Sequence, residues 1–417
     1  MEIFMKRYFK FLSMLLLFLC IPLTVHAETA KPEINAQGCA LIDASSGTIL
    51  YGKNEDCTFE PASTTKVMTA LVVLDKCKLT DEVTIQENFT SVDGTAIGLL
   101  KGDVVTVHDL LLGLLMESGN DCANELAYHV SGSIDSFAQL MNEKAKELGA
   151  TATSFRNPSG LPDPEHLTTP HDLALFLREA IKNQDFLDIA QTPYATITMI
   201  NNPERTIIIN NKNYMINKNS KYYYQYALCG KNGYTTKANH TYVSSAEKDG
   251  HILIASFLNA MDKNQNFFDM QSVFNYGFDN YSFVKLYDKG QEVAQYDVTK
   301  NLTVPLLINK TLEYPVLKGD ESTLSFDIKV NDEDLSKKSF NKDENILTGT
   351  IYVNDKKLET VDLASGVSRT YESPLSAEAF SNNPKIPIYI AVSIAGIAII
   401  VGLGIFIKKK LSINGKH

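Results

Sequence analysis

The sequence lacks the features that mark several common classes of protein. Outside its two ends it has no sustained cluster of Lys and Arg, and its formal net charge is -10 at pH 7, which argues against nucleic acid as a partner. Its cysteines show no C-x-x-C spacing and no paired His ligands accompany them, so we expect neither a bound metal nor another cofactor. Apolar residues are plentiful: 44% of the 417 residues are hydrophobic, which is enough to bury the cores of two folded domains.

The N-terminal residues have the pattern of an export signal. Lys6, Arg7 and Lys10 precede an apolar stretch over residues 11–25, and Ala27 closes a small-residue cleavage site, so we predict a cleaved signal peptide. An uncleaved signal anchor is the alternative. Export permits disulfides, but the sequence does not assign their pairing. The cysteines that remain after cleavage are Cys39, Cys57, Cys77, Cys122 and Cys229.

The C-terminal end carries a longer apolar segment. Residues 386–407 contain no charged residue, and the three lysines at 408–410 follow at once. At about 1.5 Å per residue, a helix of this length exceeds the thickness of a bilayer core, and the basic residues favour the cytoplasmic side. We therefore predict a single transmembrane helix in the cell membrane, with the folded body outside the cytoplasm.

Between these ends the spacing of apolar residues first predicts an α/β domain. Residues 39–43 and 48–51 predict a hairpin around Ser45-Ser46-Gly47, and residues 206–209 and 252–258 predict buried strands. Helical periodicity recurs in five segments, which are residues 107–116, 120–130, 134–148, 170–182 and 267–278. Helices and strands that alternate in this way are typical of an α/β fold.

The pattern changes near Phe283. Short alternating strands continue to Ser373 and predict a small all-β domain, a β-sandwich, and the residues rich in Ser, Ala, Asn and Pro that follow predict a stalk. The predicted organisation is a signal peptide at 1–27, an α/β domain at 28–282, a β-sandwich domain at 283–373, a stalk at 374–385, a transmembrane helix at 386–407 and a cytoplasmic tail at 408–417.

The most informative segment is Ser63-Thr64-Thr65-Lys66, which opens an apolar run over residues 67–74. The hydroxyl of Ser63 and the amine of Lys66 are predicted to lie one helical turn apart, on one face of a helix N-terminus, where the dipole favours developing negative charge. Pro61 fits the start of such a helix. The pair therefore predicts a nucleophile with its base attached. The same spacing recurs without this setting at Ser245/Lys248, Ser282/Lys285 and Ser339/Lys342.

Two further groups carry side chains suited to binding and catalysis. Ser118 and Asn120 offer a hydroxyl and an amide at the start of a predicted helix. The other group ends an apolar strand and consists of Lys231, Asn232, Gly233, Tyr234 and Thr235. It supplies a cation, two hydroxyls and a glycine that allows the backbone to approach a ligand. Each group alone would be assigned to a helix cap or a surface turn, but their order along the chain favours a shared site.

The motifs S-x-x-K, S-D-N and K-T-G in this order form the signature of β-lactamases and penicillin-binding proteins, and the chain, with S-T-T-K, S-G-N and K-N-G, resembles that superfamily. It is most similar to the D-alanyl-D-alanine carboxypeptidases, the low-molecular-mass penicillin-binding proteins, strongly over residues 35–285 and weakly beyond. The stretches that carry the resemblance are residues 61–66, 118–121, 155–163, 233–235 and 276–278. The resemblance implies a DD-peptidase/β-lactamase-like sheet flanked by helices, followed by the all-β domain and the membrane helix.

The resemblance also implies an activity: a serine-type carboxypeptidase that removes the terminal D-alanine from the pentapeptide stems of peptidoglycan, and that β-lactam antibiotics acylate. Ser63 would attack the penultimate D-alanine carbonyl, and Lys66 would be the base, kept neutral by burial and by the charge of Lys231. Ser118 would relay the proton, and Asn120 would hold the substrate backbone. Residues 231–235 would bind substrate, with the backbone N–H groups of Ser63 and Tyr234 facing the oxyanion.

This scheme needs neither a catalytic histidine nor a deacylating glutamate. Because a lysine serves Ser63, no His–Asp pair is required, and we predict structural roles for His166 and His171. Glu165 superficially resembles the deacylating glutamate of class A β-lactamases, but a similar stretch occurs in the carboxypeptidases without that role.

The chain departs from the family pattern at Asn232, where the family has threonine, and at Asn266, where it usually has a basic residue. Both positions would bind the substrate carboxylate. Two other functions therefore stay open: a catalytically weakened penicillin-binding scaffold of cell-wall synthesis, and a β-lactamase-like hydrolase.

Overall fold

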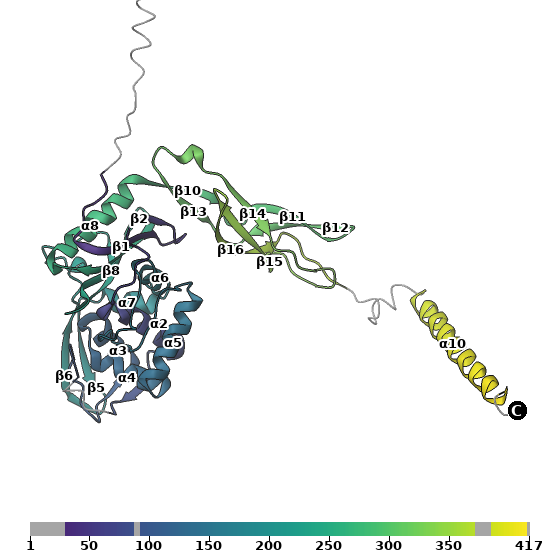
Figure 1. Cartoon of the computed structure of the whole chain (residues 1–417), viewed down its shortest axis with the longest axis horizontal. Helices are drawn as coiled ribbons and strands as arrows, with labels where there is room; N and C mark the ends of the chain where they lie inside the picture. The colour runs from purple at the N-terminus through teal and green to yellow at the C-terminus, as the bar shows by residue number, and fades with distance from the viewer. Residues whose placement is uncertain (1–29, 87–91, 372–384, 415–417) are drawn as a thin grey trace, which may run out of the picture. The chain divides into compact units, whose positions relative to one another are not determined.

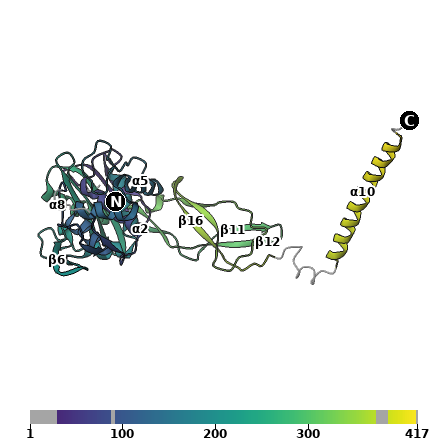
Figure 2. The same ribbon diagram turned by 90° about the horizontal axis from the view of Figure 1, so that it is seen from below.

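The computed structural model describes residues 30–86, 92–371 and 385–414 (Figures 1 and 2). The predicted signal peptide and almost all of the predicted stalk lie outside these residues. The chain divides into two compact units, one of Met1–Val284 with Glu313–Thr323 and the other of Lys285–Leu312 with Leu324–His417. The domain boundaries predicted from the sequence stay predictions.

The first unit is built around one antiparallel sheet with strand order β2-β1-β9-β8-β7. Its strands are β1 (Ala36–Asp43), β2 (Ile49–Lys53), β7 (Ala227–Thr235), β8 (Asn239–Lys248) and β9 (His251–Ala260). The predicted hairpin over residues 39–51 is confirmed, because β1 pairs with β2. The buried strand predicted at 252–258 is confirmed as the centre of β9.

Both faces of this sheet are covered by helices, which explains the continuous apolar run of β9. Ile254 and Leu258 pack with the larger helical cluster, whereas Leu253 and Phe257 point to the other face and pack against helix α8 (Lys263–Asn280) (Figure 1). Alternate residues of a strand face opposite sides of the sheet. A strand buried on both sides therefore carries apolar residues at nearly every position; the buried exception, Ser256, donates its hydroxyl to the Pro170 carbonyl.

The periodic segments predicted from the sequence form helices as expected, and capping side chains fix where they start. Thr106 and Asp109 make a capping box, and Thr169 caps the helix that Pro170 opens. The helix over residues 184–191, capped by Asn183, was not predicted. The helical elements between the first and last strands of the sheet are η1 (Ala62–Thr65), α2 (Lys66–Lys76), α3 (Val107–Leu112), η2 (Gly113–Glu117), α4 (Asn120–Ser131), α5 (Ile134–Glu147), α6 (Pro170–Ala180), α7 (Gln184–Gln191) and η3 (Tyr214–Ile216).

Two short ribbons complete the first unit, β3 (Glu82–Thr84) with β4 (Val104–Thr106) and β5 (Tyr194–Met199) with β6 (Asn202–Asn210). The strand predicted at 206–209 lies in β6, but the prediction that it is buried is wrong. Ile209 is buried, whereas Ile208 is 71% exposed. The reason is that β5 and β6 form a ribbon of two strands with only one face against the body, so alternate residues face solvent.

Apart from the C-terminal helix, the second unit is all-β, as predicted. Its antiparallel sheet has strand order β11-β12-β16-β15-β14, formed by β11 (Glu292–Thr299), β12 (Leu302–Ile308), β14 (Phe326–Val330), β15 (Asn345–Val353) and β16 (Lys356–Ser365). Asn354 and Asp355, both at positive φ, make the two-residue turn between β15 and β16. A further pair, β10 (Tyr281–Tyr287) with β13 (Leu312–Leu317), and the short η4 (Glu321–Thr323) fall largely in the first unit. The description of this domain as a sandwich stays a prediction.

The C-terminal helix α10 spans Ile386–Asn414, so the apolar segment predicted as a helix is confirmed as one. Within it, Ile388–Ile405 has a mean hydropathy of 2.5 and is, among the described residues, the one helix long and apolar enough to cross a membrane. This rests on length and composition.

Deletion of residues 384–417 is expected to convert the protein from a membrane-bound to a soluble form, because it removes the apolar helix and leaves the buried cores of both units intact. Sedimentation of membranes after expression, with thermal unfolding of the soluble fraction, measures both properties. A truncated chain that stays with the membrane after a high-salt wash would show that another segment anchors it.

Candidate active site

The amine of Lys66 is completely buried and makes three hydrogen-bond contacts. Its Nζ lies 3.1 Å from the hydroxyl of Ser63, 2.7 Å from Oδ1 of Asn120 and 2.7 Å from the backbone oxygen of Ser159. Ser63 lies in η1, which runs directly into α2, where Lys66 is the first residue. The predicted adjacency of the two side chains is therefore present, on one turn of helix.

Burial makes Lys66 a candidate base. Removal from water, and secondly the nearby charge of Lys231, hold the pKa of Lys66 well below its ordinary value. A neutral amine has two N–H groups and one lone pair. Because Asn120 and Ser159 offer only oxygen acceptors, they take the two N–H groups, and the lone pair is left for the proton of Ser63. The two acceptors thus orient the base towards the nucleophile.

The backbone around Ser63 is held by close approaches from two other segments. Ala62 has a positive φ of 48, and a Cβ on Gly160 would lie 1.8 Å from its carbonyl oxygen. A Cβ on Gly233 would lie 2.6 Å from the backbone nitrogen of Ser63. Both glycines are therefore required for these approaches. Thr241 adds a hydrogen bond of 2.8 Å to the Pro61 carbonyl.

The acceptor at Ser159 depends on a turn that the side chain of Asn157 organises. Its Oδ1 accepts from the backbone N–H groups of Ser159, Gly160 and Leu161 and from the Ser159 hydroxyl. This turn presents the Ser159 carbonyl to Lys66. Asn157 was part of the resemblance found in the sequence, but its positioning role was not predicted. The acceptor that it positions is the backbone oxygen of Ser159, and every residue type has such an oxygen.

Ser118 and Asn120 lie where η2 meets α4. Ser118 has left-handed backbone, with φ 71, and lines the same cleft as Ser63. Asn120 is buried, and its side chain is shared between Lys66 and the Asp93 carbonyl, to which Nδ2 donates at 2.6 Å. The structure therefore places Asn120 as a partner of Lys66. Its predicted contact with the substrate backbone stays a prediction.

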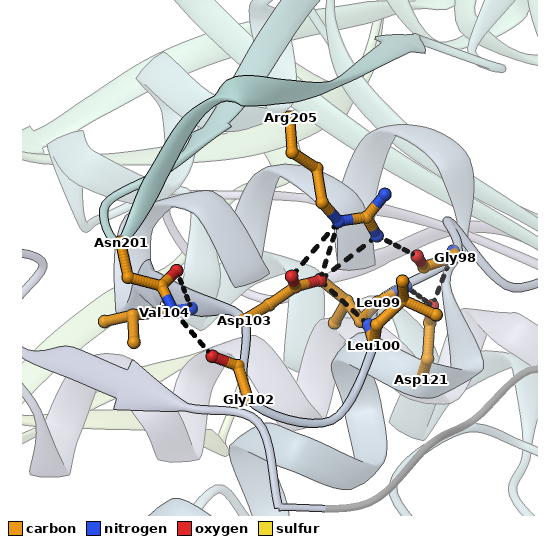
Figure 3. A network of polar contacts seen from close by, with 9 residues as sticks. All are labelled: Gly98, Leu99, Leu100, Gly102, Asp103, Val104, Asp121, Asn201 and Arg205. Atoms are coloured by element: carbon orange, nitrogen blue, oxygen red, sulfur yellow. Dashed lines mark hydrogen bonds and ion pairs between the residues drawn. The ribbon is translucent and has the colours of Figure 1, made fainter.

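The loop over residues 93–103 is held from two directions, as Figure 3 shows. From α4, the carboxylate of Asp121 accepts from the backbone N–H groups of Ile97, Gly98 and Leu99. From β6, the guanidinium of Arg205 contacts the carboxylate of Asp103 at 3.1 Å and donates to the Gly98 carbonyl at 2.7 Å.

This loop forms one wall of the site. Gly94 and Thr95 line the cleft beside Ser63, and the Thr95 carbonyl accepts from the backbone N–H of Asn120 at 2.7 Å. The loop and Asn120 therefore fix one another. Asn201 secures the far end of the loop, because it donates to the Gly102 carbonyl at 2.7 Å (Figure 3).

The five residues predicted at the end of β7 do not all have the same environment. Lys231 is buried, and burial lowers its pKa to about 7, opposed by the nearby charge of Glu117. Asn232, Gly233 and Tyr234 line the cleft. Thr235 also lines it, on the other side of Ser63, and its hydroxyl accepts from the N–H of residue 238 at 2.9 Å, which closes the turn between β7 and β8.

The cleft continues on both sides of Ser63. One part, of about 450 Å³, extends along β7 to the start of α8. The other, of about 330 Å³, runs past Asn120 to the turn at Leu161 and Pro162. Ser63 and Tyr234 line both parts. A nucleophile in the middle of an open cleft can act on an extended chain that occupies both sides.

Charged side chains that the sequence analysis did not single out also line the larger part of the cleft. Lys263, the first residue of α8, lies one helical turn before Asn266, and both line it. Asn266 itself is buried and accepts from Asn35 at 3.1 Å. Glu117 and Lys212 form an ion pair of 2.9 Å at the same cleft. Lys263 could have been predicted to share a face of the helix with Asn266, because residues three apart on a helix lie on the same face.

The remaining candidates have other environments. His166 is buried, contacts the Thr65 hydroxyl at 2.9 Å and accepts from the Arg156 N–H; burial lowers its pKa to about 4. His171 lies 3.9 Å from Asp56. Glu165 pairs with Arg156 at 2.6 Å on the surface. The other Ser-x-x-Lys pairs lie in strands or in a loop, not on a helix.

The fold places a buried lysine beside a serine in an open cleft, as expected for a serine hydrolase, and comparison with known proteins identifies the family. Residues 25–262 match the family described as D-alanyl-D-alanine carboxypeptidase, and residues 281–370 match penicillin-binding protein 5, C-terminal domain. The chain belongs to the D-alanyl-D-alanine carboxypeptidase family.

Individual relatives agree. The chain is 30% identical over 317 residues to D-alanyl-D-alanine carboxypeptidase DacF of Bacillus subtilis, which covers 73% of this chain and 79% of that protein. It is 35% identical over 252 residues to DacB2 of Mycobacterium tuberculosis, covering 59% and 84%. The structure of penicillin binding protein 5 from Haemophilus influenzae is similar with a TM-score of 0.65 and 25% identity, over 81% of this chain and 98% of that one.

Proposed function

We propose that the protein is an exported, membrane-anchored serine carboxypeptidase that removes the terminal D-alanine from peptidoglycan stem peptides, and that β-lactams acylate the same serine. The observation that carries the proposal is the buried amine of Lys66, which two fixed acceptors orient towards Ser63. The signal peptide at 1–27, the cytoplasmic tail at 408–417 and the site assignments belong to the proposal. The family to which the protein belongs, its fold and the composition of α10 support this proposal.

The chemistry begins with transfer of the Ser63 proton to neutral Lys66, as the Ser63 oxygen attacks the carbonyl of the penultimate D-alanine. The backbone N–H groups of Ser63 and Tyr234 face the oxyanion that forms. The close approach of Gly233 to the Ser63 nitrogen supports this, because it brings the end of β7 beside the nucleophile. Ser118 passes the proton to the departing amine, and water then hydrolyses the acyl-enzyme.

The terminal carboxylate of the substrate needs donors, and the larger part of the cleft offers two. Asn232 has an amide N–H in place of the threonine hydroxyl of the family. Lys263 supplies a positive charge one helical turn before Asn266, so the cation missing at residue 266 is present on the same face of α8. Lys263 and Asn232 together form the proposed carboxylate subsite. On this basis the substitution at residue 266 does not indicate a loss of catalysis.

A β-lactamase-like activity is favoured less, because rapid deacylation needs a base beside the acyl-enzyme. Among the described residues that line the cleft, Glu117 is the one carboxylate, and it pairs with Lys212. The β-lactam adduct is therefore proposed to be long-lived.

The proposal is tested by mass spectrometry of the purified protein after exposure to penicillin and, separately, to a pentapeptide that ends in D-Ala-D-Ala. Wild-type protein is expected to carry a penicilloyl group on Ser63 and to release D-alanine, and Ser63→Ala to do neither, since the variant lacks the hydroxyl that Lys66 contacts. Glu165→Gln is the matched control and should behave as wild type. An adduct on another serine would refute the site assignment; an adduct without release of D-alanine would favour the scaffold.

The rate of acylation by penicillin is expected to be bell-shaped in pH. Lys66 acts as a base only when neutral, so the rate falls as pH drops through its lowered pKa. Lys231 keeps its positive charge only below its pKa of about 7, so the rate falls again as pH rises beyond that. Lys231→Arg keeps the charge at all these pH values and should move the alkaline limb upward. Stopped-flow measurements of the acylation rate report both limbs. An alkaline limb that stays at the same pH in the variant would show that it does not arise from the loss of the positive charge of Lys231.

Lys263→Ala is expected to lower kcat/KM on the peptide acid by about 10- to 100-fold, since one hydrogen bond to a charged group contributes about 1.5 to 3 kcal/mol. A peptide that ends in an amide should be affected little. Lys237→Ala removes a cation from the other part of the cleft and is the control. Asn232→Thr should raise kcat/KM on the acid, because a compact hydroxyl needs less ordering. Equal effects of Lys263→Ala on acid and amide would contradict the subsite.

A further inference from the structure

Three side chains far from Ser63 converge at the other end of the two helices that carry the site. Cys77 follows the last residue of α2, Asp81 lies in the turn before β3, and His129 is in the last turn of α4. Their thiol, carboxylate and imidazole ligand atoms all lie within 4.8 Å of one another. We propose that Cys77, Asp81 and His129 bind a zinc ion.

The chemistry of the three groups favours zinc. Thiolate sulfur, imidazole nitrogen and carboxylate oxygen are its usual ligands in proteins, and three protein ligands leave a fourth position for water. Calcium and magnesium prefer oxygen ligands alone. A thiolate and a carboxylate also balance the charge of a divalent cation. Cys77 and Asp81 are half-buried and His129 is exposed, so the site has both a protected side and an open path for the ion.

The backbone prepares the cluster for a cation. The C-terminal ends of α2 and α4 meet there, and helix C-termini carry partial negative charge that stabilises a nearby cation. Asp81 is fixed in the turn, because its Oδ2 accepts from the backbone N–H of Lys78 at 2.9 Å and its carbonyl accepts from Val107 at 2.9 Å. One carboxylate oxygen is left for the ion. The side chain is therefore already ordered before a metal binds.

The position of the cluster gives the ion a role. Helix α2 begins at Lys66 and α4 begins at Asn120, and the two helices pack against each other. Zinc bound to Cys77 and His129 would join their far ends and so hold the relative position of the lysine and its amide partner. The ion would stabilise the fold and would take no part in the reaction. The sequence led us to expect no bound metal, because these ligands do not have the short spacing of common zinc motifs.

The test uses the full chain in detergent, prepared metal-free under a non-chelating reductant. Isothermal titration with Zn²⁺ is expected to show one ion per chain, and zinc at about a hundredfold above Kd should raise Tm by about 5 to 10 °C. Co²⁺ in place of Zn²⁺ should give a thiolate-to-cobalt charge-transfer band in the near ultraviolet, which reports Cys77 as a ligand.

Cys77→Ser and His129→Asn are expected to lose the titration signal, the Tm shift and the cobalt band, while penicillin still labels Ser63 and so reports an intact fold. Cys57→Ser, which changes an exposed cysteine outside the cluster, is the matched control and should bind as wild type. His129 is exposed, so its variant keeps the test decisive if Cys77→Ser fails to fold. Absence of zinc binding by the unaltered protein, or equal binding by His129→Asn, would overturn the proposal.

Discussion

The amine of Lys66 is buried away from water, and the arrangement of the polar groups around it follows from that burial. A protonated amine in such a place carries a desolvation penalty of several kcal/mol unless an anion compensates it. The largest electrostatic effect of a neighbouring group comes from Lys231, which has the same sign, and the opposing effect of Asp121 is smaller. The neutral form is therefore favoured. A neutral amine still needs acceptors for its two N–H groups, and Asn120 and Ser159 supply them. Burial and orientation together suit Lys66 to the role of base that we propose, and none of its hydrogen-bond partners among the described residues is an acid.

These acceptors are brought together by segments far apart in the sequence, and each is fixed by further contacts. The Ser159 carbonyl depends on the turn around Asn157 and on the approach of Gly160 to Ala62. Asn120 is held by the loop over residues 93–103, which Arg205 of β6 secures from the other side (Figure 3). Small displacements of such supports change the geometry of a reacting group. The polar network is therefore part of the site even where it touches no substrate.

The sequence predicted those parts of the structure that depend on local patterns. The pair of Ser63 and Lys66 on one helical turn, the hairpin of β1 and β2 and the continuous apolar run of β9 all follow from periodicity and capping. The missed parts depend on contacts between distant residues. The Ser159 carbonyl carries no side-chain signature, the sequence around Arg205 does not indicate its pairing with Asp103, and Ile208 is exposed because only one face of the β5–β6 ribbon lies against the body. Which face of a strand is covered is decided by tertiary packing.

The cleft also shows why a substitution should be judged by position in space. Residue 266 lacks the positive charge that its family usually has there, yet Lys263 lines the same part of the cleft one helical turn earlier. A lysine has a long, flexible side chain and acts as a point charge, so its head group can serve a site from more than one backbone position. In the proposed subsite the positive charge is therefore supplied by Lys263, and Asn232 would be the second donor to the substrate carboxylate.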